Sequence, residues 1–278
     1  MSQPPIVTDA SVPAATPAMP AGSSFSPSLD GLRSLGLAAA GLVIFILIWE
    51  ALPRLGLFNP MLLPGPSAIP AAFWSELTSG AWTSAVKASL GHYTIGLVVG
   101  SVLGLVCGVA TGMSRLAEDM TSWVVRVLRP IPGLAWVPFA IIWFGVSQSS
   151  AVFIIAIGVF WIVFFAAHGA IRGVDRDLIE VADAFGFRSA HERLFKILLP
   201  AAMPGILVGM RTALGQAWMA VVAAEIFGVP GLGQRMIQAS SLLATEIVVV
   251  YMLTMAALYG VLDTLFVAVQ GRVLRWKA

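Results

Sequence analysis

Reactive side chains are scarce in this chain of 278 residues. It has a single cysteine, Cys107, which excludes an intrachain disulfide and a metal site built from several cysteines. The lysines are Lys87, Lys196 and Lys277, and none of them follows a glycine. A P-loop needs a Gly-Lys pair to hold nucleotide phosphates, so this chain cannot itself hydrolyse ATP by that mechanism.

Histidines are equally few and are scattered at His92, His168 and His191. The pair His191-Glu192 is not followed by the second histidine of a zinc-binding helix, and no Gly-x-Ser-x-Gly motif occurs. We therefore expect no catalytic residue, no metal ligand and no cofactor in this chain. Any process that needs energy must draw it from a partner protein or an ion gradient.

Charge is also sparse: charged residues make up 11% of the chain, hydrophobic residues 58%, and the mean hydropathy is +0.90. This composition predicts an all-α polytopic membrane protein. We predict about six spans, because six apolar segments approach the ~20 residues that cross a hydrocarbon core. The third segment reaches that length only if the residues before it are counted. The segments are Leu35–Leu52, Leu90–Met113, Gly133–Gly145, Ala151–Ala170, Gly205–Phe227 and Ile247–Gln270.

Most basic residues lie on one side of these spans. An even number of spans puts both termini on that side, and only Arg54, Lys87 and Arg235 fall on the other. By the positive-inside rule both termini are cytoplasmic. The net charge of +2 reports this topology and does not indicate nucleic-acid binding. The cytoplasmic set is Arg33, Arg115, Arg172, Arg176, Arg188, Arg193, Lys196, Arg272, Arg275 and Lys277.

The chain divides into a tail and a membrane domain. Residues 1–33 are rich in Pro, Ala and Ser, which predicts a disordered cytoplasmic tail, and residues 34–278 form the transmembrane domain. Between the first two spans, residues 68–77 predict a short interfacial helix outside the membrane. That helix is either structural or a docking point for a partner on the outer face.

A polar segment between the fourth and fifth spans predicts a helix-turn-helix. Asp175 or Asp177 is placed to cap a first helix, and Glu180 is spaced as a capping-box partner of Asp177. That helix runs to about Phe185. Gly186 follows, where a helix end favours a left-handed residue.

A second short helix follows the glycine. Ser189 and Glu192 form a capping box at its start. Pro200 and Pro204 are expected to reset the backbone before the fifth span, since proline is tolerated at helix starts and not in the middle. The two helices make a compact corner that either docks a partner or only connects the spans.

This segment resembles the cytoplasmic coupling loop of permeases of bacterial ABC importers. The family pattern is Glu-Ala-Ala, three residues, Gly, a spacer, and Ile-x-Leu-Pro. Val181 replaces the middle Ala, and the distance from Gly to Pro is one residue longer, which leaves the register of the second helix open. The resemblance implies a coupling segment, residues 172–204, that contacts an ATPase. The ATPase-coupling residues it implies are Glu180, Ala182, Asp183, Gly186, Arg188, Ile197, Leu199 and Pro200.

Glycines recur at every fourth position of the second span and leave a smooth strip on one helix face. Such faces let another helix backbone approach closely in lipid. We assign these residues to helix packing, with packing inside the chain favoured over a seam between two copies. They are Gly96, Gly100, Gly104, Gly108 and Gly112.

The third apolar segment is interrupted by three prolines in the run Arg-Pro-Ile-Pro-Gly-Leu-Ala-Trp-Val-Pro, which begins at Arg129. Its helix must break or kink there, and broken backbone at membrane depth faces protein or a water-filled cavity. With the Ile-Trp-Phe-Gly that starts at Ile142, the run resembles the same stretch in permeases for sulfonates, taurine and nitrate. It either lines a pathway or is a kink that fits the bundle.

Ionisable residues in spans usually face a cavity, a partner or the interface. Ala224-Glu225 followed by Gly231-Leu232-Gly233 again matches that permease subfamily, and Glu225 either shapes an outer gate or snorkels to the interface. Arg211 lies at the other end of the same span, so we expect no pair between the two. Arg126 and Arg129 either help an anion pass or anchor the span end. The pathway or gate candidates are Arg126, Arg129, Trp136, Pro138, Trp143, Trp218 and Glu225.

The resemblance runs from about residue 35 to the C-terminus. It implies a permease subunit of an ATP-driven importer that moves a small solute across the inner membrane by alternating access, with an oxyanion such as a sulfonate, taurine or nitrate expected. It also implies a second copy of the chain, cytoplasmic ATPase subunits that hold ATP and Mg, and a periplasmic or lipid-anchored substrate-binding protein.

Two other classes remain open from the residues alone. A secondary transporter or channel driven by an ion gradient would carry an ionisable relay along the midplane and often an internal repeat. The sequence shows no convincing repeat, and its ionisable residues gather towards span ends. A membrane scaffold would not need the broken third span. Co-purification with a soluble ATPase separates the importer from both.

Overall fold

The computed structural model describes residues 29–187 and 189–277. Every regular element in these ranges is a helix, so the all-α prediction is confirmed. Residues 1–28 of the expected tail lie outside the described residues, whereas the last part of that tail already belongs to helix α1, Leu29–Arg54. The described residues up to Ile48 form one structural unit, and those from Trp49 form another.

Five helices in the described ranges are long and apolar enough to cross a membrane. A sixth span results if the bent pair Arg115–Leu128 and Gly133–Phe144 counts as one, with an angle of 83° between its parts. The prediction of about six spans therefore holds with the third span broken, as the prolines in it require. The five unbroken spans are Gly36–Arg54, Ala81–Met113, Gln148–Arg172, Ala190–Ile226 and Thr245–Val273.

The loop between the first two spans contains a short helix, α2, Ile69–Thr78, where the interfacial helix was expected. A 3-10 turn, Pro66–Ala68, leads into it. The carboxylate of Glu50 holds this turn, because it accepts hydrogen bonds from the backbone N–H of Ser67 at 3.0 Å and from the Ser67 hydroxyl at 2.8 Å. These two bonds fix where the chain enters α2.

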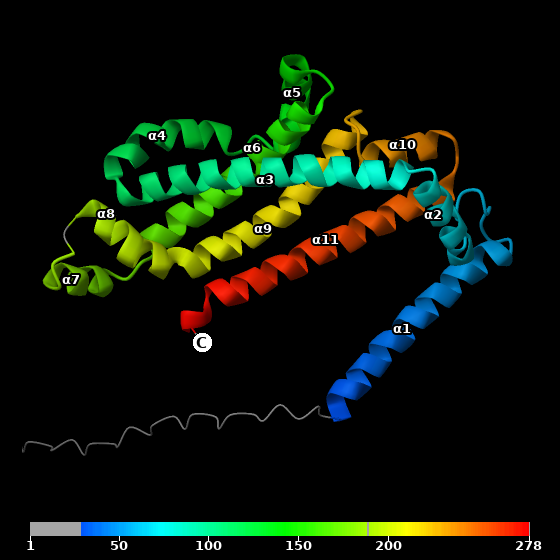
Figure 1. The fold of residues 1–278 in the computed structure, drawn as a ribbon, viewed down its shortest axis with the longest axis horizontal. Coiled ribbons are helices and arrows are strands. Elements are labelled where there is room, and N and C mark those ends of the chain that lie inside the picture. The colour runs from blue at the N-terminus through cyan, green and yellow to red at the C-terminus, as the bar shows by residue number, and fades with distance from the viewer. Residues whose placement is uncertain (1–28, 188, 278) are drawn as a thin grey trace, which may run out of the picture. The chain divides into compact units, whose positions relative to one another are not determined.

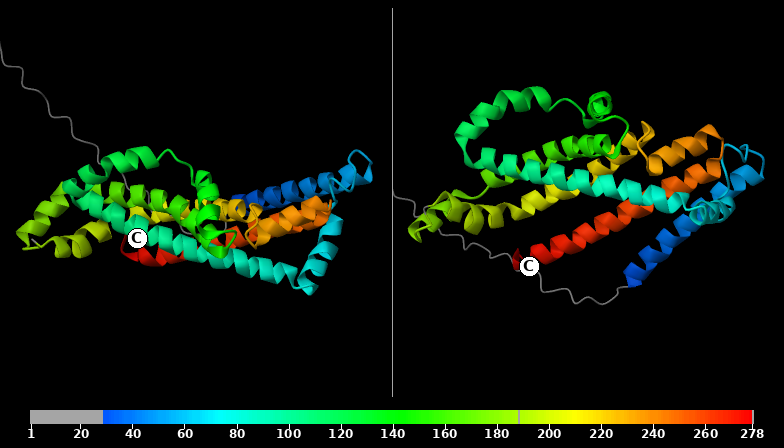
Figure 2. Two further views of the ribbon diagram at one scale, coloured as in Figure 1. Left: turned by 90° about the horizontal axis from the view of Figure 1, so that it is seen from above. Right: turned by 45° about the horizontal axis from the view of Figure 1, so that its top comes forward.

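Helices α3, Ala81–Met113, and α6, Gln148–Arg172, pack against each other along their length (Figures 1 and 2). A Cβ atom at Gly100 would lie 2.5 Å from the carbonyl oxygen of Ala156, and one at Gly108 would lie 2.5 Å from that of Phe164. Gly96, Gly104 and Gly112 also face α6. The glycine strip therefore forms a seam inside the chain, and the two helices run parallel along it.

Helix α9, Leu199–Ile226, packs against α6 and also contacts α3 (Figures 1 and 2). A Cβ atom at Gly205 would lie 3.0 Å from Cβ of Ala170, so the backbones approach closely here as well. Tyr93 on α3 and Trp218 on α9 pack edge to face, with 5.3 Å between ring centroids. The largest hydrophobic core of the described residues lies among these three helices.

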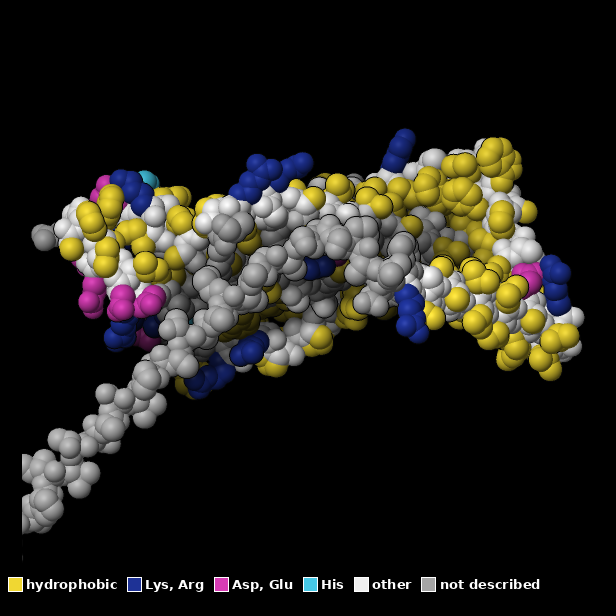
Figure 3. All heavy atoms as spheres, turned by 90° about the horizontal axis from the view of Figure 1, so that it is seen from below, with side chains coloured by type: hydrophobic (Ala, Val, Ile, Leu, Met, Phe, Trp, Pro, Cys, Tyr) yellow, Lys and Arg dark blue, Asp and Glu magenta, His cyan; other side chains and the backbone are white. Residues whose placement is uncertain are grey.

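Two further helices complete the C-terminal part of this unit. Helix α10, Leu232–Ser241, follows a glycine-containing turn after α9, and helix α11, Thr245–Val273, returns antiparallel to α9. At the opposite end of α9 lie helices α7, Arg176–Ala184, and α8, Ala190–Arg193. Figure 3 shows acidic, basic and histidine side chains gathered at the end of the molecule that carries α7 and α8.

Candidate functional site

The first helix of the coupling segment is capped by Asp175. Its carboxylate accepts a hydrogen bond of 3.1 Å from the backbone N–H of Asp177, and α7 begins one residue later, at Arg176. Asp177 lies inside the helix, so of the two caps predicted the first is formed, and Asp177 and Glu180 make no capping box. Glu180 is exposed, whereas Ala182 is 6% exposed and packs inward.

Gly186 ends this helix in the left-handed conformation that the sequence predicts, with φ at +88°. The N–H of Gly186 donates to the carbonyl of Asp183 at 3.1 Å, and the N–H of Phe187 donates to that of Ala182 at 3.0 Å. This pattern closes the helix as a Schellman motif. A Cβ atom at Gly186 would meet nothing within 4 Å, so the backbone angle alone favours glycine here.

The second helix is not the short, separate element that we predicted. Ser189 caps it as expected, accepting from the N–H of Glu192 at 3.2 Å, but the helical course then continues from Ala190 to Ile226 without a break. Pro200 lies in the first turn of α9, and Pro204 lies inside that helix. Neither proline separates α9 from α8.

A π-helical turn, Leu194–Leu198, joins α8 to α9. Its closing bond runs from the N–H of Leu199 to the carbonyl of Leu194, five residues back. A π turn holds one residue more than an α turn. The one residue by which the distance between Gly186 and Pro200 exceeds the family pattern matches the one residue that this turn adds.

Arg193 ties the corner of the coupling segment together. Its guanidinium pairs with the carboxylate of Asp183 and donates a hydrogen bond of 3.2 Å to the carbonyl of Phe187. Lys196 lies 4.8 Å from the centre of the Phe187 ring. The corner is therefore held by contacts from both helices.

One face of α7 exposes apolar side chains to the outside. Leu178 is 51% exposed, Val181 54% and Phe185 78%, at positions that share a helix face. Val181, the departure from the family pattern, is part of this surface. Among the other coupling residues, Ile197 and Leu199 are half-buried and Pro200 is exposed, while Arg188 lies outside the described residues.

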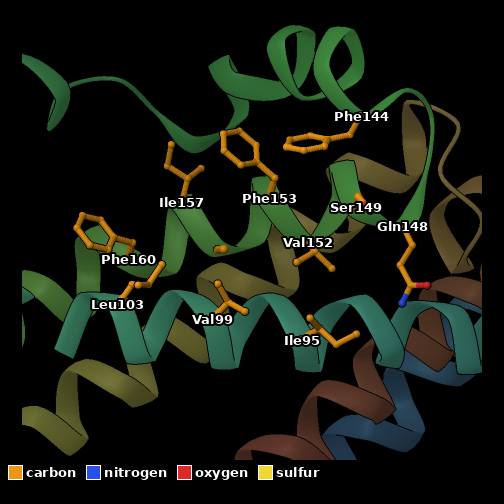
Figure 4. A pocket seen from close by; sticks show the side chains of 11 residues that line it. Ile95, Val99, Leu103, Phe144, Gln148, Ser149, Val152, Phe153, Ile157 and Phe160 are labelled. Atoms are coloured by element: carbon orange, nitrogen blue, oxygen red, sulfur yellow. The ribbon is translucent and has the colours of Figure 1, made fainter. Parts of the chain in front are cut away.

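The broken third span builds an aromatic cluster beside an apolar cavity. Trp143 and Phe153 pack with 5.7 Å between ring centroids, and Trp136 lies 6.3 Å from Phe153. A cavity of about 610 Å³ opens between α3, α5 (Val137–Phe144) and α6, with Phe144 and Phe153 side by side in its wall (Figure 4). The Nε1 atom of Trp136 is buried and has no hydrogen-bond partner among the described residues.

The predicted pathway residues do not form one site. Trp136 and Trp143 pack in the aromatic cluster, and Trp218 is 8% exposed in the core against Tyr93. Pro138 opens α5. Arg126 and Arg129 line a separate polar cavity between α3, α4 (Arg115–Leu128) and α6.

Glu225 is completely buried near the end of α9. Its Oε1 accepts a hydrogen bond of 2.5 Å from the Ser89 hydroxyl and lies 2.7 Å from Nε2 of His92, and both of these residues are on α3. Its Oε2 accepts a 2.7 Å bond from the N–H of Gly233. The alternative that Glu225 snorkels to the interface is therefore wrong, because buried partners satisfy both oxygens.

The glycines after α9 make room for this carboxylate. A Cβ atom at Gly231 would overlap the carboxyl group of Glu225, and one at Gly233 would lie 2.9 Å from Cβ of Glu225. The N–H of Leu232 donates a 3.0 Å bond to the hydroxyl of Ser89, so the start of α10 is tied to α3 as well. The motif Glu225–Gly231–Gly233 is thus one structural unit that joins α3, α9 and α10.

A second polar cluster, formed by residues of α2, α10 and α11, was not predicted from the sequence. Arg235 on α10 donates hydrogen bonds of 3.0 and 2.9 Å to the two oxygens of Glu76 on α2, and the Tyr251 hydroxyl of α11 donates to Glu76 at 2.6 Å. Burial raises the pKa of Glu76, but the hydrogen bonds from Tyr251 and Arg235 and the charge of Arg235 outweigh it and hold this pKa below its ordinary value of 4.5. Glutamate in an amphipathic helix is an ordinary surface pattern, so no local signal marked it.

Arg211 pairs with a residue of another span. Its Nε and Nη2 atoms donate to the two carboxylate oxygens of Asp263 on α11 at 2.9 and 2.8 Å. Tyr259, one helical turn from Asp263, faces Gly215, one turn from Arg211. Arg211 and Glu225 therefore lie in different polar clusters, as their positions at opposite ends of one span suggest.

The described residues contain no group of His, Cys, Asp and Glu side chains that could hold a metal ion. Their polar clusters pair acids with arginine, histidine and hydroxyl groups, an arrangement that stabilises helix contacts inside a membrane.

Comparisons with known proteins agree with this geometry. The chain is 32% identical over 235 residues to the putative aliphatic sulfonates transport permease protein SsuC of Bacillus subtilis, covering 84% of this chain and 85% of that protein. It is 28% identical over 259 residues to the taurine transport system permease protein TauC of Escherichia coli, covering 88% and 90%. A solved structure of the MetNI methionine ABC transporter, inward facing, shares the fold with a TM-score of 0.59 at 22% identity, covering 73% of this chain and 99% of that one.

The profile of binding-protein-dependent transport system inner membrane components matches residues 100–277, which include the coupling segment and the Glu225 motif. The prediction of a permease subunit, with ATP hydrolysis in a separate subunit, is confirmed. The ion-gradient alternative is not supported by these matches. The chain therefore belongs to the family of inner membrane components of binding-protein-dependent ABC transport systems.

Proposed function

We propose that this permease imports a small organic or inorganic oxyanion, with alkanesulfonates and taurine as the first candidates and nitrate as a further one. The support is the similarity over most of the chain to permeases named for aliphatic sulfonates and for taurine. Both classes of compound carry a sulfonate group, a strong hydrogen-bond acceptor with a fixed negative charge. An anion of this kind needs basic or N–H groups along its path.

The ATPase would dock on the coupling segment. Support comes from the exposed apolar face of α7, Leu178, Val181 and Phe185, which lies on a corner that Arg193 ties together. Glu180 and Pro200 are also exposed, whereas Ala182 is buried. Arg188, Ile197 and Leu199 complete the proposed set of coupling residues. ATP and Mg would be held by the ATPase subunits and not by this chain.

Glu225 would act as a latch between α3, α9 and the start of α10. A buried carboxylate that satisfies three donors from two other elements holds those elements in one arrangement, and its bonds must break if they separate. Alternating access needs such a bistable contact between spans. Trp136, Pro138 and Trp143 would shape the broken span beside it, while Arg126, Arg129 and Trp218 remain proposed pathway residues.

We propose that the chain lies in the inner membrane of a bacterial cell, with both termini in the cytoplasm. The coupling segment then faces the ATPase, and the Glu76–Arg235–Tyr251 cluster faces the outside. Two copies of the chain would form the pathway, and a periplasmic or lipid-anchored binding protein would deliver the substrate to the outer face. The basic residues on the coupling side support this orientation.

Affinity purification of the tagged chain from its native membrane in mild detergent tests this proposal. Mass spectrometry of the bound proteins should identify an ATPase with a P-loop and a substrate-binding protein. Binding of taurine, ethanesulfonate and nitrate to that binding protein, measured by calorimetry, then ranks the substrates. A preparation with no ATPase, under conditions that preserve a known ABC complex, would contradict the proposed assembly.

A further inference from the structure

The polar cavity beside α4 carries two arginines that no acid neutralises. It has a volume of about 580 Å³ and lies between α3, α4 and α6 near the end of α3. Arg126 and Arg129 line it, and among the described residues neither forms an ion pair with a carboxylate. The acid of the cavity, Glu118, is already paired with Arg172 and lies 3.7 Å from Nε2 of His168. The cavity therefore holds an excess of positive charge.

Aromatic rings keep the two guanidinium groups in place. The Arg126 group lies 4.9 Å from the centre of the Trp123 ring, and the Arg129 group lies 4.6 Å from that of Phe165. Stacking on a ring leaves the edge of a guanidinium, with its N–H donors, free to bind an acceptor. Two such edges at one cavity suit an oxyanion, which accepts several charge-assisted hydrogen bonds at once.

Helix α4 turns its polar side towards this cavity and its apolar side outward. Thr121 and Ser122 line the cavity, whereas Leu116, Met120 and Val127 are 71%, 73% and 62% exposed. That apolar outward face suits contact with lipid chains. Val125, Phe164 and Phe165 add apolar surface to the cavity wall. The cavity thus has a basic side for a head group and an apolar side for a chain, next to the lipid.

We propose that this cavity binds an oxyanion head group joined to an apolar chain. Two sources share that chemistry: the phosphate of an anionic phospholipid from the neighbouring leaflet, and an alkanesulfonate in transit. Basic pockets between helices on the cytoplasmic side are general binding sites for anionic lipid head groups. The phospholipid source needs only the cavity, whereas the alkanesulfonate source rests on the proposed import function.

Native mass spectrometry of the full-length protein, purified with any subunits it recruits, tests the proposal. The detergent-solubilised protein is titrated with phosphatidylglycerol, with phosphatidylcholine, and with butanesulfonate. The variants are R126Q/R129Q, the charge-preserving R126K/R129K, and R115Q as the matched control. Arg115 lies on the same helix and is exposed, but it does not line the cavity.

We expect phosphatidylglycerol to bind at least tenfold tighter than phosphatidylcholine to the wild type and R115Q. This preference should be weaker in R126K/R129K, which keeps the charge but loses the stacked guanidinium edges, and should disappear in R126Q/R129Q. If butanesulfonate instead binds and is lost in the same double variant, the anion in transit is the source. The proposal is overturned if R126Q/R129Q binds phosphatidylglycerol and butanesulfonate as tightly as the wild type does. This comparison requires that the wild type and the variant both elute as monodisperse protein. ATPase recruitment is measured in the same samples. Failure of the proposed import function can therefore be distinguished from failure of the proposed binding site.

Discussion

The Oε1 atom of Glu225 lies 2.7 Å from Nε2 of His92, although the two residues are 133 positions apart in the chain. Ser89 donates to the same oxygen, and Gly233 donates to the other. All side chains of this cluster are buried between α3, α9 and α10. The cluster joins the second and fifth spans at the point where the chain turns towards α10.

Replacing Glu225 with Gln should slow transport and leave the ATPase assembly intact. The amide offers one acceptor oxygen in place of two, so at least one of the buried donors loses its partner at a cost of about 1–3 kcal/mol. The stability of the arrangement in which this cluster joins α3, α9 and α10 should fall by a similar amount. Uptake into proteoliposomes, thermal unfolding and ATPase co-purification are the three measurements.

Glu246→Gln is the control for this variant, because it removes a carboxylate from the first turn of α11 outside the cluster. It should behave like the wild type in all three measurements. Uptake by Glu225→Gln at the wild-type rate would show that the cluster is structural packing and not a latch.

Replacing Gly186 with Val should abolish ATPase recruitment without preventing membrane insertion. The backbone at this position has φ of +88°, which a β-branched residue adopts only with a strain of about 1–3 kcal/mol. The corner of the coupling segment should therefore distort. Gly186→Asn is the matched control, since asparagine tolerates the left-handed region, and it should retain the ATPase in a pull-down. Equal recruitment by the valine and asparagine variants would contradict the role of this corner.

Deleting Phe195 should be tolerated. Phe195 is 55% exposed in the π-helical turn, and its removal lets the turn relax to α-helical geometry while both flanking helices keep their faces. Val208 lies in the middle of α9 and is 61% exposed. Its deletion should instead rotate the part of α9 that precedes it by about 100° relative to the part that follows, and abolish folding or coupling. Expression level, ATPase recruitment and ATP hydrolysis compare the two deletions. Two equally damaging deletions would show that the turn is not a local insertion.

The Glu76–Arg235 pair should make stability depend on acid pH. The pKa of Glu76 is held below its ordinary value of 4.5, so the carboxylate stabilises the fold above that pH and loses this contribution as pH falls through the lowered value. Thermal unfolding in detergent from pH 7 to pH 3, compared with Glu76→Gln, measures the effect. The gap in Tm between the two proteins should be full at pH 7 and should shrink below about pH 4.5. A gap that stays constant down to pH 3 would contradict this assignment.

Local rules predicted much of the coupling segment. Capping by Asp175 and the left-handed Gly186 depend on a few neighbouring residues, and the spans depend on runs of apolar residues, so both could be inferred from the sequence. The glycine strip predicted a close contact with another helix, but the sequence did not identify α6 as that helix. These features need no knowledge of distant parts of the chain.

The partners of the buried charges could not be predicted in the same way. Ser89 and His92 lie far from Glu225 in sequence, and nothing local marks either residue as a binding partner of a carboxylate. The same holds for Asp263 and Arg211, which α9 and α11 bring together. The π-helical turn was also missed, because it depends on the packing of the helices on both sides of it. Pro204 was wrongly expected to lie outside the fifth span.

The most direct test of the importer is uptake into proteoliposomes that contain the purified permease with its co-purifying subunits and binding protein. Labelled taurine, ethanesulfonate and nitrate are offered outside, with ATP and Mg²⁺ inside, before and after ionophores collapse all ion gradients. If import is driven by ATP, at least one anion should accumulate only with ATP, at a rate that the ionophores do not change. Uptake that proceeds without ATP and stops when the gradients collapse would contradict it.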